Sequence, residues 1–177
     1  PMGTILYIHT VPPSGGGDTL FASMYAAYEA LSGRLQRFLG ELTAVHDGQQ
    51  YYVGRYGGRD LRDGAYPSAE HPAIRTHPVT GRQALYVNEV FTTGFKELKQ
   101  AESNALLAFV LKHCAAPEFQ CRFRWRQNSV AFWDNRCTQH HAIWDYYPQT
   151  RHGYRVTIKG DRPFYAEADV DGRRAIP

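Results

Sequence analysis

Short strand-like runs at both ends of the chain constrain its fold more than any other feature. Residues 4–10 are apolar and rich in β-branched side chains, and residues 119–125 alternate apolar and polar positions as a half-buried strand does. Residues 129–133 and 153–158 repeat the strand-like pattern near the C-terminal end. A chain that begins and ends in strands, with helices between them, is expected to be mainly β or α+β.

The middle of the chain predicts helices and further strands. Apolar residues recur at helical spacing over residues 24–39, with a break expected at Ser32–Gly33, and over residues 97–114. Residues 71–75 and 83–87 are expected to be two more strands, because β-branched and apolar residues gather there.

Residues 47–69 are polar and rich in glycine and tyrosine, and no helical or strand period fits them. This segment is expected to be a long loop, which in a compact domain is either a mobile lid over a site or a disordered stretch. The whole chain of 177 residues is expected to form one domain, residues 1–177. A chain of that length can bury a core without disulfides or a structural metal.

Charge and cysteine content exclude several classes of partner. The formal net charge is only +3 and the basic residues are scattered, so no nucleic-acid partner is expected. No apolar stretch approaches the length of a membrane span, so no membrane partner is expected either. The three cysteines are odd in number and form no CxxC pair, which favours a cytoplasmic protein without a disulfide framework.

Two motifs could carry chemistry. Gly15–Thr19 is a glycine-rich turn that delivers a threonine hydroxyl into a strand, although a plain hairpin turn has the same pattern. Trp133–His141 is a polar cluster between apolar runs, which is costly unless it is fully hydrogen-bonded. A neutral imidazole at His140 or His141 could bind a metal, and a structural histidine is the alternative.

A pair of arginines follows this cluster. Arg151 and Arg155 are four residues apart, so on a strand both side chains point to the same face. Two guanidinium groups on one face could bind a dianion, and solvent-exposed arginines are the alternative. His141 and Asp145 have a spacing that would bind zinc on a helix, but no further ligands with zinc-like spacing accompany them.

These motifs resemble those of the taurine dioxygenase (TauD/TfdA-like) family. The segments that carry the resemblance, in the order in which the family has them, are Gly16–Phe21, His77–Arg82, Tyr86–Glu89, Phe91–Thr93 and Trp133–His140. The resemblance extends from about residue 1 to residue 165. It implies a mainly β double-stranded β-helix (jelly roll) with helical insertions, and an enzyme that uses Fe(II), 2-oxoglutarate and O₂.

The resemblance also implies roles for five residues. His140 matches the distal histidine of an iron site that two histidines and one carboxylate form in this family. Arg151 and Thr19 match the residues that hold the far carboxylate of 2-oxoglutarate, a dianion that suits the bidentate guanidinium of arginine. Arg155 matches an arginine that touches the anionic substrate or 2-oxoglutarate. Phe91 matches an aromatic residue of the substrate pocket.

The chain departs from the family pattern at the first two iron ligands. The family provides them in a His-x-Asp/Glu motif upstream of the segment that Pro1–Gly3 resembles, and no such motif occurs in this chain. Because the chain starts inside a strand-like run, we expect it to be the C-terminal two-thirds of such an enzyme, without its N-terminal strands. One histidine holds Fe(II) poorly, so the chain alone is expected to be inactive.

The expected function is hydroxylation of a small anionic substrate with release of succinate and CO₂. Taurine and other sulfonates, alkyl sulfates and aryloxyalkanoates are typical of the family. The alternative is a non-catalytic jelly-roll module that binds a small carboxylate or a protein partner and has lost the iron site. A third hypothesis is a zinc hydrolase built on His140, His141 and Asp145. Members of the family form dimers or tetramers, so the resemblance also admits a homo-oligomer.

Overall fold

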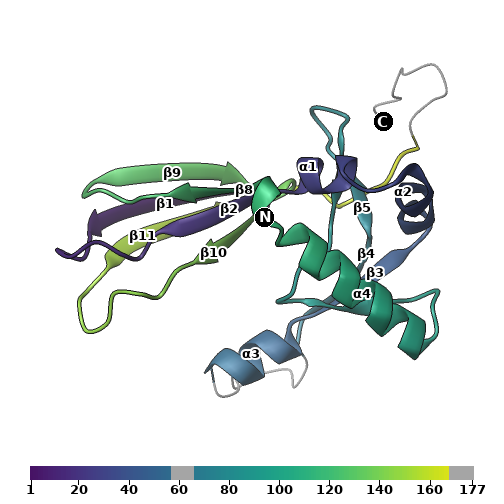
Figure 1. The fold of residues 1–177 in the computed structure, drawn as a ribbon, viewed down its shortest axis with the longest axis horizontal. Coiled ribbons are helices and arrows are strands. Elements are labelled where there is room, and N and C mark those ends of the chain that lie inside the picture. The colour runs from purple at the N-terminus through teal and green to yellow at the C-terminus, as the bar shows by residue number, and fades with distance from the viewer. Residues whose placement is uncertain (57–65, 168–177) are drawn as a thin grey trace.

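The computed structural model describes residues 1–56 and 66–167 (Figure 1). Two antiparallel three-stranded sheets form one side of the molecule. The first sheet has the strand order β11-β1-β9, and the second has the order β10-β2-β8. The strands are β1 (Gly3–Thr10), β9 (Ser129–Asp134) and β11 (His152–Ile158) in the first sheet, and β2 (Thr19–Ser23), β8 (Gln120–Phe123) and β10 (Thr138–Ala142) in the second.

The two sheets lie face to face (Figure 1). Aromatic side chains pack between them. Phe21 on β2 contacts Trp133 on β9, and the two ring centroids are 5.1 Å apart. Because side chains alternate along a strand, the residues next to Trp133 point away from this interior. The outer face of the first sheet accordingly carries exposed apolar side chains, namely Val130, Phe132, Tyr154 and Val156.

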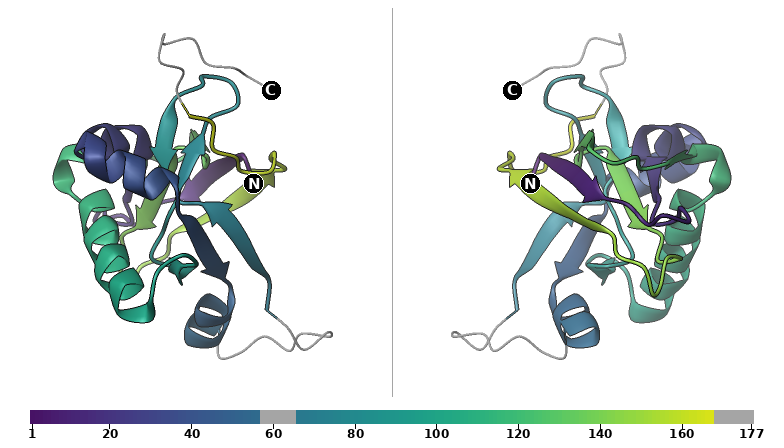
Figure 2. Two further views of the ribbon diagram at one scale, coloured as in Figure 1. Left: turned by 90° about the vertical axis from the view of Figure 1, so that its right-hand side faces the viewer. Right: turned by 90° about the vertical axis from the view of Figure 1, so that its left-hand side faces the viewer.

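The other side of the molecule combines helices with short strands. The helices are α1 (Met24–Glu29), α2 (Gly33–Gly40), α3 (Gln49–Tyr56), α4 (Gln100–Cys114) and the 3-10 helix η1 (Pro117–Phe119). Strand β3 (Thr43–Asp47) pairs with β4 (Ser68–Pro72) and β7 (Thr92–Phe95), and β5 (Ile74–Thr76) pairs with β6 (Gln83–Leu85). Figure 2 shows α1, α2 and α4 gathered on one side of these short strands.

The main hydrophobic core lies in this helical half. Its fully buried large side chains are Met24, Leu39, Ile74, Leu85, Val87 and Val110. Ser23 and Ser32 cap the first turns of α1 and α2 with their hydroxyl oxygens, and the expected break between these two helices is confirmed. Ser103 on α4 accepts a hydrogen bond of 2.8 Å from the backbone N–H of Phe95, which joins this helix to β7.

Two parts of the predicted secondary structure are wrong. The sequence predicts a loop over residues 47–69, but α3 and the start of β4 lie within it; residues 57–65 are outside the described part of the chain. The sequence also does not predict β3, β7 and β10, which are four or five residues long. Such short strands are stabilised mainly by the strands they pair with, so local composition identifies them poorly. Among the described residues, no helix is both long enough and apolar enough to cross a membrane.

Candidate active site

His140 lies on β10 opposite Phe21 of β2, and its ring packs toward the interior between the sheets while part of the residue is exposed to solvent. Its ring centroid is 4.8 Å from that of Trp133 and 6.3 Å from that of Phe21. Contact with these rings desolvates the imidazole and lowers the pKa of His140, and the nearby Arg155 and His141 lower it further. His140 is therefore neutral at pH 7, the form in which histidine binds a metal.

Arg151 is the second feature of the interior. Its guanidinium lies over the ring of Trp125, with Cζ 5.3 Å from the ring centroid. The Nε and Nη2 atoms are buried and have no hydrogen-bond partner. Burial lowers the pKa of Arg151, whereas Tyr146 and Asp18 act in the opposite direction. A buried cation with two unpaired nitrogens is costly by itself, so this arrangement favours an anionic ligand.

Thr19 lies beside the same tryptophan and is almost fully buried, with 1% of its surface exposed. The Nε1–H of Trp125 donates to the Thr19 hydroxyl oxygen over 3.0 Å. Because this hydroxyl already accepts a hydrogen bond, its own O–H remains available to a second acceptor. Trp125 thus holds a hydroxyl donor and a guanidinium donor next to each other.

The glycine turn before β2 is part of this arginine pocket. Gly17 has φ +68°, and a Cβ atom there would lie 2.5 Å from Cδ of Arg151. The backbone N–H of Gly17 donates to Oδ1 of Asp145 over 2.7 Å. Nε of Arg122 donates to Oδ2 of Asp18, also over 2.7 Å. The turn is therefore fixed from both sides, and only glycine leaves room for the Arg151 side chain.

A row of aromatic rings connects the arginine pocket with the histidine. The centroid separations are 4.8 Å between Trp125 and Phe123, 6.4 Å between Phe123 and Phe21, and 5.1 Å between Phe21 and Trp133. The arginine lies over the first ring of this row and the histidine contacts the last. Both groups consequently border one apolar interior between the two sheets.

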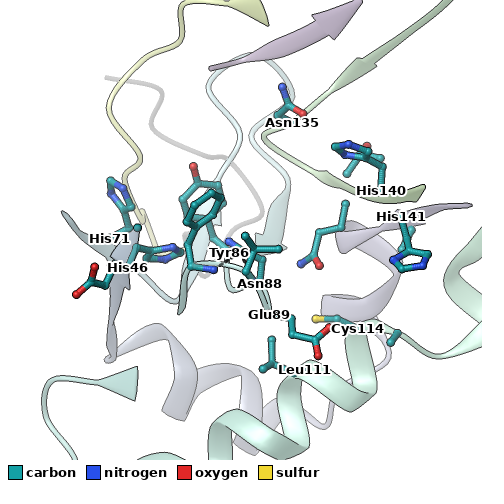
Figure 3. Close-up of a pocket in the computed structure, with 18 of the residues that line it drawn as sticks. His46, His71, Tyr86, Asn88, Glu89, Leu111, Cys114, Asn135, His140 and His141 are labelled. Carbon is teal, nitrogen blue, oxygen red and sulfur yellow. Dashed lines mark hydrogen bonds between the residues drawn. The ribbon is translucent and has the colours of Figure 1, made fainter. Parts of the chain in front are cut away.

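A cavity of about 810 Å³ opens beside β10 (Figure 3). His140 lines it on one side, and His46, His71 and Tyr86 lie on the opposite side. Phe91 also lines the cavity, and its backbone oxygen accepts from the N–H of Asp47, next to His46. Burial lowers the pKa of His46 to about 4, and His71 at a centroid distance of 5.1 Å contributes. His71 also has a lowered pKa, mainly because of burial. Both histidines are therefore uncharged at pH 7.

The five residues that the resemblance singles out fall into two groups. Phe91 and His140 line the cavity, whereas Thr19 and Arg151 share the pocket around Trp125. Arg155 is exposed on β11, close enough to His140 to lower its pKa. Arg151 precedes β11, which begins at His152, so the two arginines do not both lie on one strand as their spacing suggested.

Sequence reasoning did not find the cavity wall of His46, His71 and Tyr86. The first two are 25 positions apart in the sequence, and strand pairing brings them together: His71 is the partner of Ala44 on β3, two residues before His46. The only local signal is a histidine on each of two neighbouring strands, and neither strand was predicted with its observed bounds.

The Trp133–Arg136 part of the polar motif is largely a scaffold. Nε1 of Trp133 donates to Oδ1 of Asn135 over 2.9 Å, and Nδ2 of Asn135 donates to the hydroxyl of Thr4 on β1 over 2.7 Å. Nη2 of Arg136 donates to Oδ2 of Asp134 over 2.6 Å. These bonds satisfy the polar groups whose burial made the motif costly, and they fix β9 against β1.

His77, Asp134 and Cys137 are the only three potential metal-binding side chains that cluster among the described residues. Hydrogen bonding argues against a metal there. Nδ1 of His77 accepts from the backbone N–H groups of Val79 and Thr80, both at 3.2 Å. The ring proton must then lie on Nε2, which donates to Oδ2 of Asp134 over 3.0 Å. Neither ring nitrogen of His77 has a free lone pair for a metal.

His140, the candidate iron ligand, belongs to no group of three potential metal ligands among the described residues. By themselves they do not fit a site of two histidines and a carboxylate. The zinc hypothesis is also not supported by the geometry that it required. His141 lies on strand β10 rather than on a helix, and Oδ1 of Asp145 is taken by the backbone of Gly17.

Fold and site together define a mainly β protein with helices, in which an arginine with two buried, unpaired nitrogens and a neutral histidine border one aromatic interior. A family model described as "Taurine catabolism dioxygenase TauD, TfdA family" matches residues 1–157. The chain belongs to this family, as its motifs predicted.

Relatives and solved structures agree with this membership. An alpha-ketoglutarate-dependent sulfonate dioxygenase of Saccharomyces cerevisiae is 38% identical over 85% of this chain and 37% of its own length. An alpha-ketoglutarate-dependent sulfate ester dioxygenase of Pseudomonas putida is 35% identical over 92% of this chain and 56% of its own. The crystal structure of a taurine dioxygenase from Burkholderia xenovorans has a TM-score of 0.79 and 38% identity, over 98% of this chain and 56% of that one. The chain thus spans about half the length of the curated relatives that it matches.

Proposed function

We propose that this chain is the 2-oxoglutarate-binding part of an Fe(II)- and 2-oxoglutarate-dependent dioxygenase with a jelly-roll fold. Its reaction is the hydroxylation of a small organic anion, with release of succinate and CO₂. The observation that carries the proposal is the buried Arg151 guanidinium, whose Nε and Nη2 have no partner and which shares Trp125 with the Thr19 hydroxyl.

The arginine pocket suits the far carboxylate of 2-oxoglutarate. Two unpaired nitrogens on one guanidinium can donate two parallel hydrogen bonds to the two oxygens of a carboxylate. The Thr19 hydroxyl adds a third donor. Trp125 and the aromatic row provide an apolar wall for the carbon chain between the two ends of the ligand.

His140 would hold the iron at the other end of the aromatic row. Bound Fe(II) would supply the redox chemistry with O₂ that protein side chains lack. Since the described residues offer only this one ligand, we expect the other two to come from polypeptide outside these 177 residues. The length of the relatives, about twice the matched region, supports that expectation.

The substrate would enter through the cavity. Phe91, Tyr86 and the neutral imidazoles of His46 and His71 suit the carbon skeleton of a substrate. Arg155 provides a positive charge near His140. A sulfonate, a sulfate ester or an aryloxyalkanoate combines a carbon skeleton with one anionic group. The names of the S. cerevisiae and P. putida relatives support the first two classes.

The test is an anaerobic titration of the protein, expressed with all of its encoded sequence, with Fe(II) and 2-oxoglutarate. The expected result is a visible metal-to-ligand charge-transfer band that saturates with 2-oxoglutarate and bleaches when O₂ is admitted. A folded protein without this band would contradict the proposal.

A second candidate is a module that binds a small carboxylate without catalysis. The observation in its favour is that His140 belongs to no group of three potential metal ligands among the described residues. In that case calorimetry would show 2-oxoglutarate binding whose affinity does not change with Fe(II). An affinity that rises when Fe(II) is added would instead favour the enzyme.

A further inference from the structure

Two histidines meet on the surface at the end of the pair β1 and β11, away from the site described above. The register between these strands shifts between Ile8 and Thr10, so His9 has no partner on β11 and bulges from the strand. His152 is the partner of Thr10. The bulge turns the His9 ring toward His152, and the two ring centroids are 4.7 Å apart at an interplanar angle of 84°.

A hydrogen bond joins one nitrogen of each ring. Nε2 of His9 and Nδ1 of His152 are 2.8 Å apart, and Nδ1 of His9 is 2.8 Å from the Thr10 hydroxyl. If His9 donates its Nδ1–H to Thr10, its Nε2 carries a lone pair, and the proton between the rings belongs to His152. A metal-binding histidine is commonly oriented in this way, by donating its other ring N–H to an oxygen.

The spacing of these nitrogens fits a metal ion with ligands at right angles. With metal–nitrogen bonds of about 2.0–2.1 Å, two ligands at 90° are separated by about 2.9 Å, and tetrahedral ligands by about 3.3 Å. The observed 2.8 Å matches the first geometry. That geometry is preferred by Cu(II) and Ni(II), both of which bind imidazole well.

We propose that His9 and His152 form a binding site for a divalent transition ion of the Cu(II) or Ni(II) type. The ion takes the place of the proton between the rings: solvent transfers the proton of His152 from Nδ1 to Nε2, and the freed Nδ1 lone pair binds the metal together with Nε2 of His9. Water fills the remaining positions, because His152 is exposed. The other contacts of the two rings are with Tyr7, Tyr154 and Thr10, none of which carries a positive charge that would repel the ion.

This site has a consequence for the arginine pocket. His152 is the first residue of β11 and follows Arg151 directly. A metal bound by His9 and His152 would link the start of β11 to β1, directly next to Arg151. The site is nevertheless independent of the proposed function, because neither histidine contacts His140, Thr19 or Arg151 in any hydrogen bond or ring contact of the described residues.

Calorimetric titration with Ni(II), and with Cu(II) in a second series, tests the proposal. The protein carries no affinity tag, and it carries His140→Ala so that the proposed iron site does not bind the ion. One strong site is expected. His152→Gln and, separately, His9→Gln should each weaken it about tenfold or more, since even the loss of a supporting contact around a metal has such an effect. Electron paramagnetic resonance of the Cu(II) form should show two nitrogen ligands.

His141→Gln in the same His140→Ala protein is the matched control, because it removes another exposed histidine. It should leave the affinity unchanged. Circular dichroism without metal verifies that each variant is folded, and the two separate variants keep the test decisive if one of them is not. Two results would overturn the proposal. One is metal binding by the His9 and His152 variants that is as strong as in the parent His140→Ala protein. The other is a loss of affinity in the His141 control as large as in these two variants.

Discussion

Arg151 and Gly17 depend on each other at the scale of single residues. The arginine side chain passes so close to the glycine that any Cβ atom there would overlap with it. The two nitrogens that remain without partners are therefore held in place by the turn, and they do not depend on the ligand for their position. A donor group that is fixed before binding loses little conformational entropy when the ligand arrives.

Replacing Arg151 by alanine should weaken 2-oxoglutarate binding strongly. Loss of one partner of a buried charged pair costs about 2–5 kcal/mol, which corresponds to roughly 30-fold or more in Kd. Calorimetry on the Fe(II)-loaded protein under anaerobic conditions measures this change. Arg126→Ala removes an exposed arginine nearby and serves as the control. An unchanged Kd in Arg151→Ala would show that another group binds the carboxylate.

Gly17→Ala and Gly15→Ala form a matched pair. Both glycines have positive φ, at +68° and +85°, so both substitutions bear a similar cost of about 1–2 kcal/mol for the left-handed conformation. Only at Gly17 does the new Cβ meet Arg151, whereas nothing lies within 4 Å of Gly15. We expect both variants to lose thermal stability, but only Gly17→Ala to lose affinity for 2-oxoglutarate as well. A similar loss of affinity in both would remove the steric explanation.

At the scale of elements, the polar motif between β9 and β10 links the two halves of the molecule. Asp134 at the end of β9 accepts from Arg136 and from His77, which lies in the turn between β5 and β6. Burial alone would raise the pKa of Asp134, but these hydrogen bonds outweigh it and hold the pKa well below its ordinary value. The native state therefore keeps this carboxylate ionised at acidic pH values at which the same group in an unfolded chain is protonated.

The Asp134 network predicts a pH dependence of stability. Because the pKa of Asp134 is lower in the folded protein than its value of about 3.9 in unfolded chains, its contribution is present above that value and diminishes as the pH falls below it. Asp134→Asn should lower the free energy of unfolding at pH 7 by about 1.5–3 kcal/mol. At pH 3 the difference from the unmodified protein should be smaller. Urea unfolding at both pH values measures it, and an equal difference at both would contradict the argument.

The elements that the sequence predicted share one property, a strong pattern of their own. The strands near residues 4–10 and 153–158 and the helix near residues 97–114 are long, with regular apolar positions, and they are confirmed. Strand β10 carries the run Thr138–Ala142, which is mostly polar and gains its structure from pairing with β2. Its polar residues indicated a functional site, and because they lack the apolar alternation of a typical strand, the strand was not predicted.

The candidate site shows the same division. Thr19, His140 and Arg151 could be singled out because their motifs are specific. The resemblance implied that Arg151 and Thr19 meet, but the contact of both with Trp125 could not be foreseen, because it depends on how the chain continues from β8 beyond its pairing with β2. The cavity wall of His46 and His71 likewise exists only through pairing between strands.

At the scale of the whole molecule, stability and chemistry are placed in different halves. The main core packs around α1, α2 and α4, whereas the aromatic interior lies between the two three-stranded sheets. Figure 1 shows these halves side by side, with α1 following directly from β2. The helical half can therefore hold the turn, β2 and β10 in position while the interior remains free to bind ligands.

The chain of 177 residues should separate ligand binding from turnover. Its arginine pocket is complete, so calorimetry without metal should detect binding of 2-oxoglutarate. With Fe(II) and O₂ added, it should produce no succinate, because His140 has no companion ligands among the described residues. A full-length relative, such as the sulfate ester dioxygenase of Pseudomonas putida, is the comparison. Succinate production by the 177 residues alone would show that they hold iron after all.

The three tryptophans give the molecule an intrinsic optical reporter at each end of the interior. Trp125 lies under Arg151 and Trp133 lies against His140, each with 7% of its surface exposed, whereas Trp144 is 73% exposed. With Trp144→Phe removing the solvent-facing emitter, the remaining fluorescence should come from the two buried indoles. We expect a carboxylate ligand to change the emission of Trp125 and a paramagnetic metal to quench Trp133. Single Trp→Phe replacements would then separate the arrival of one ligand from that of the other in a single stopped-flow trace.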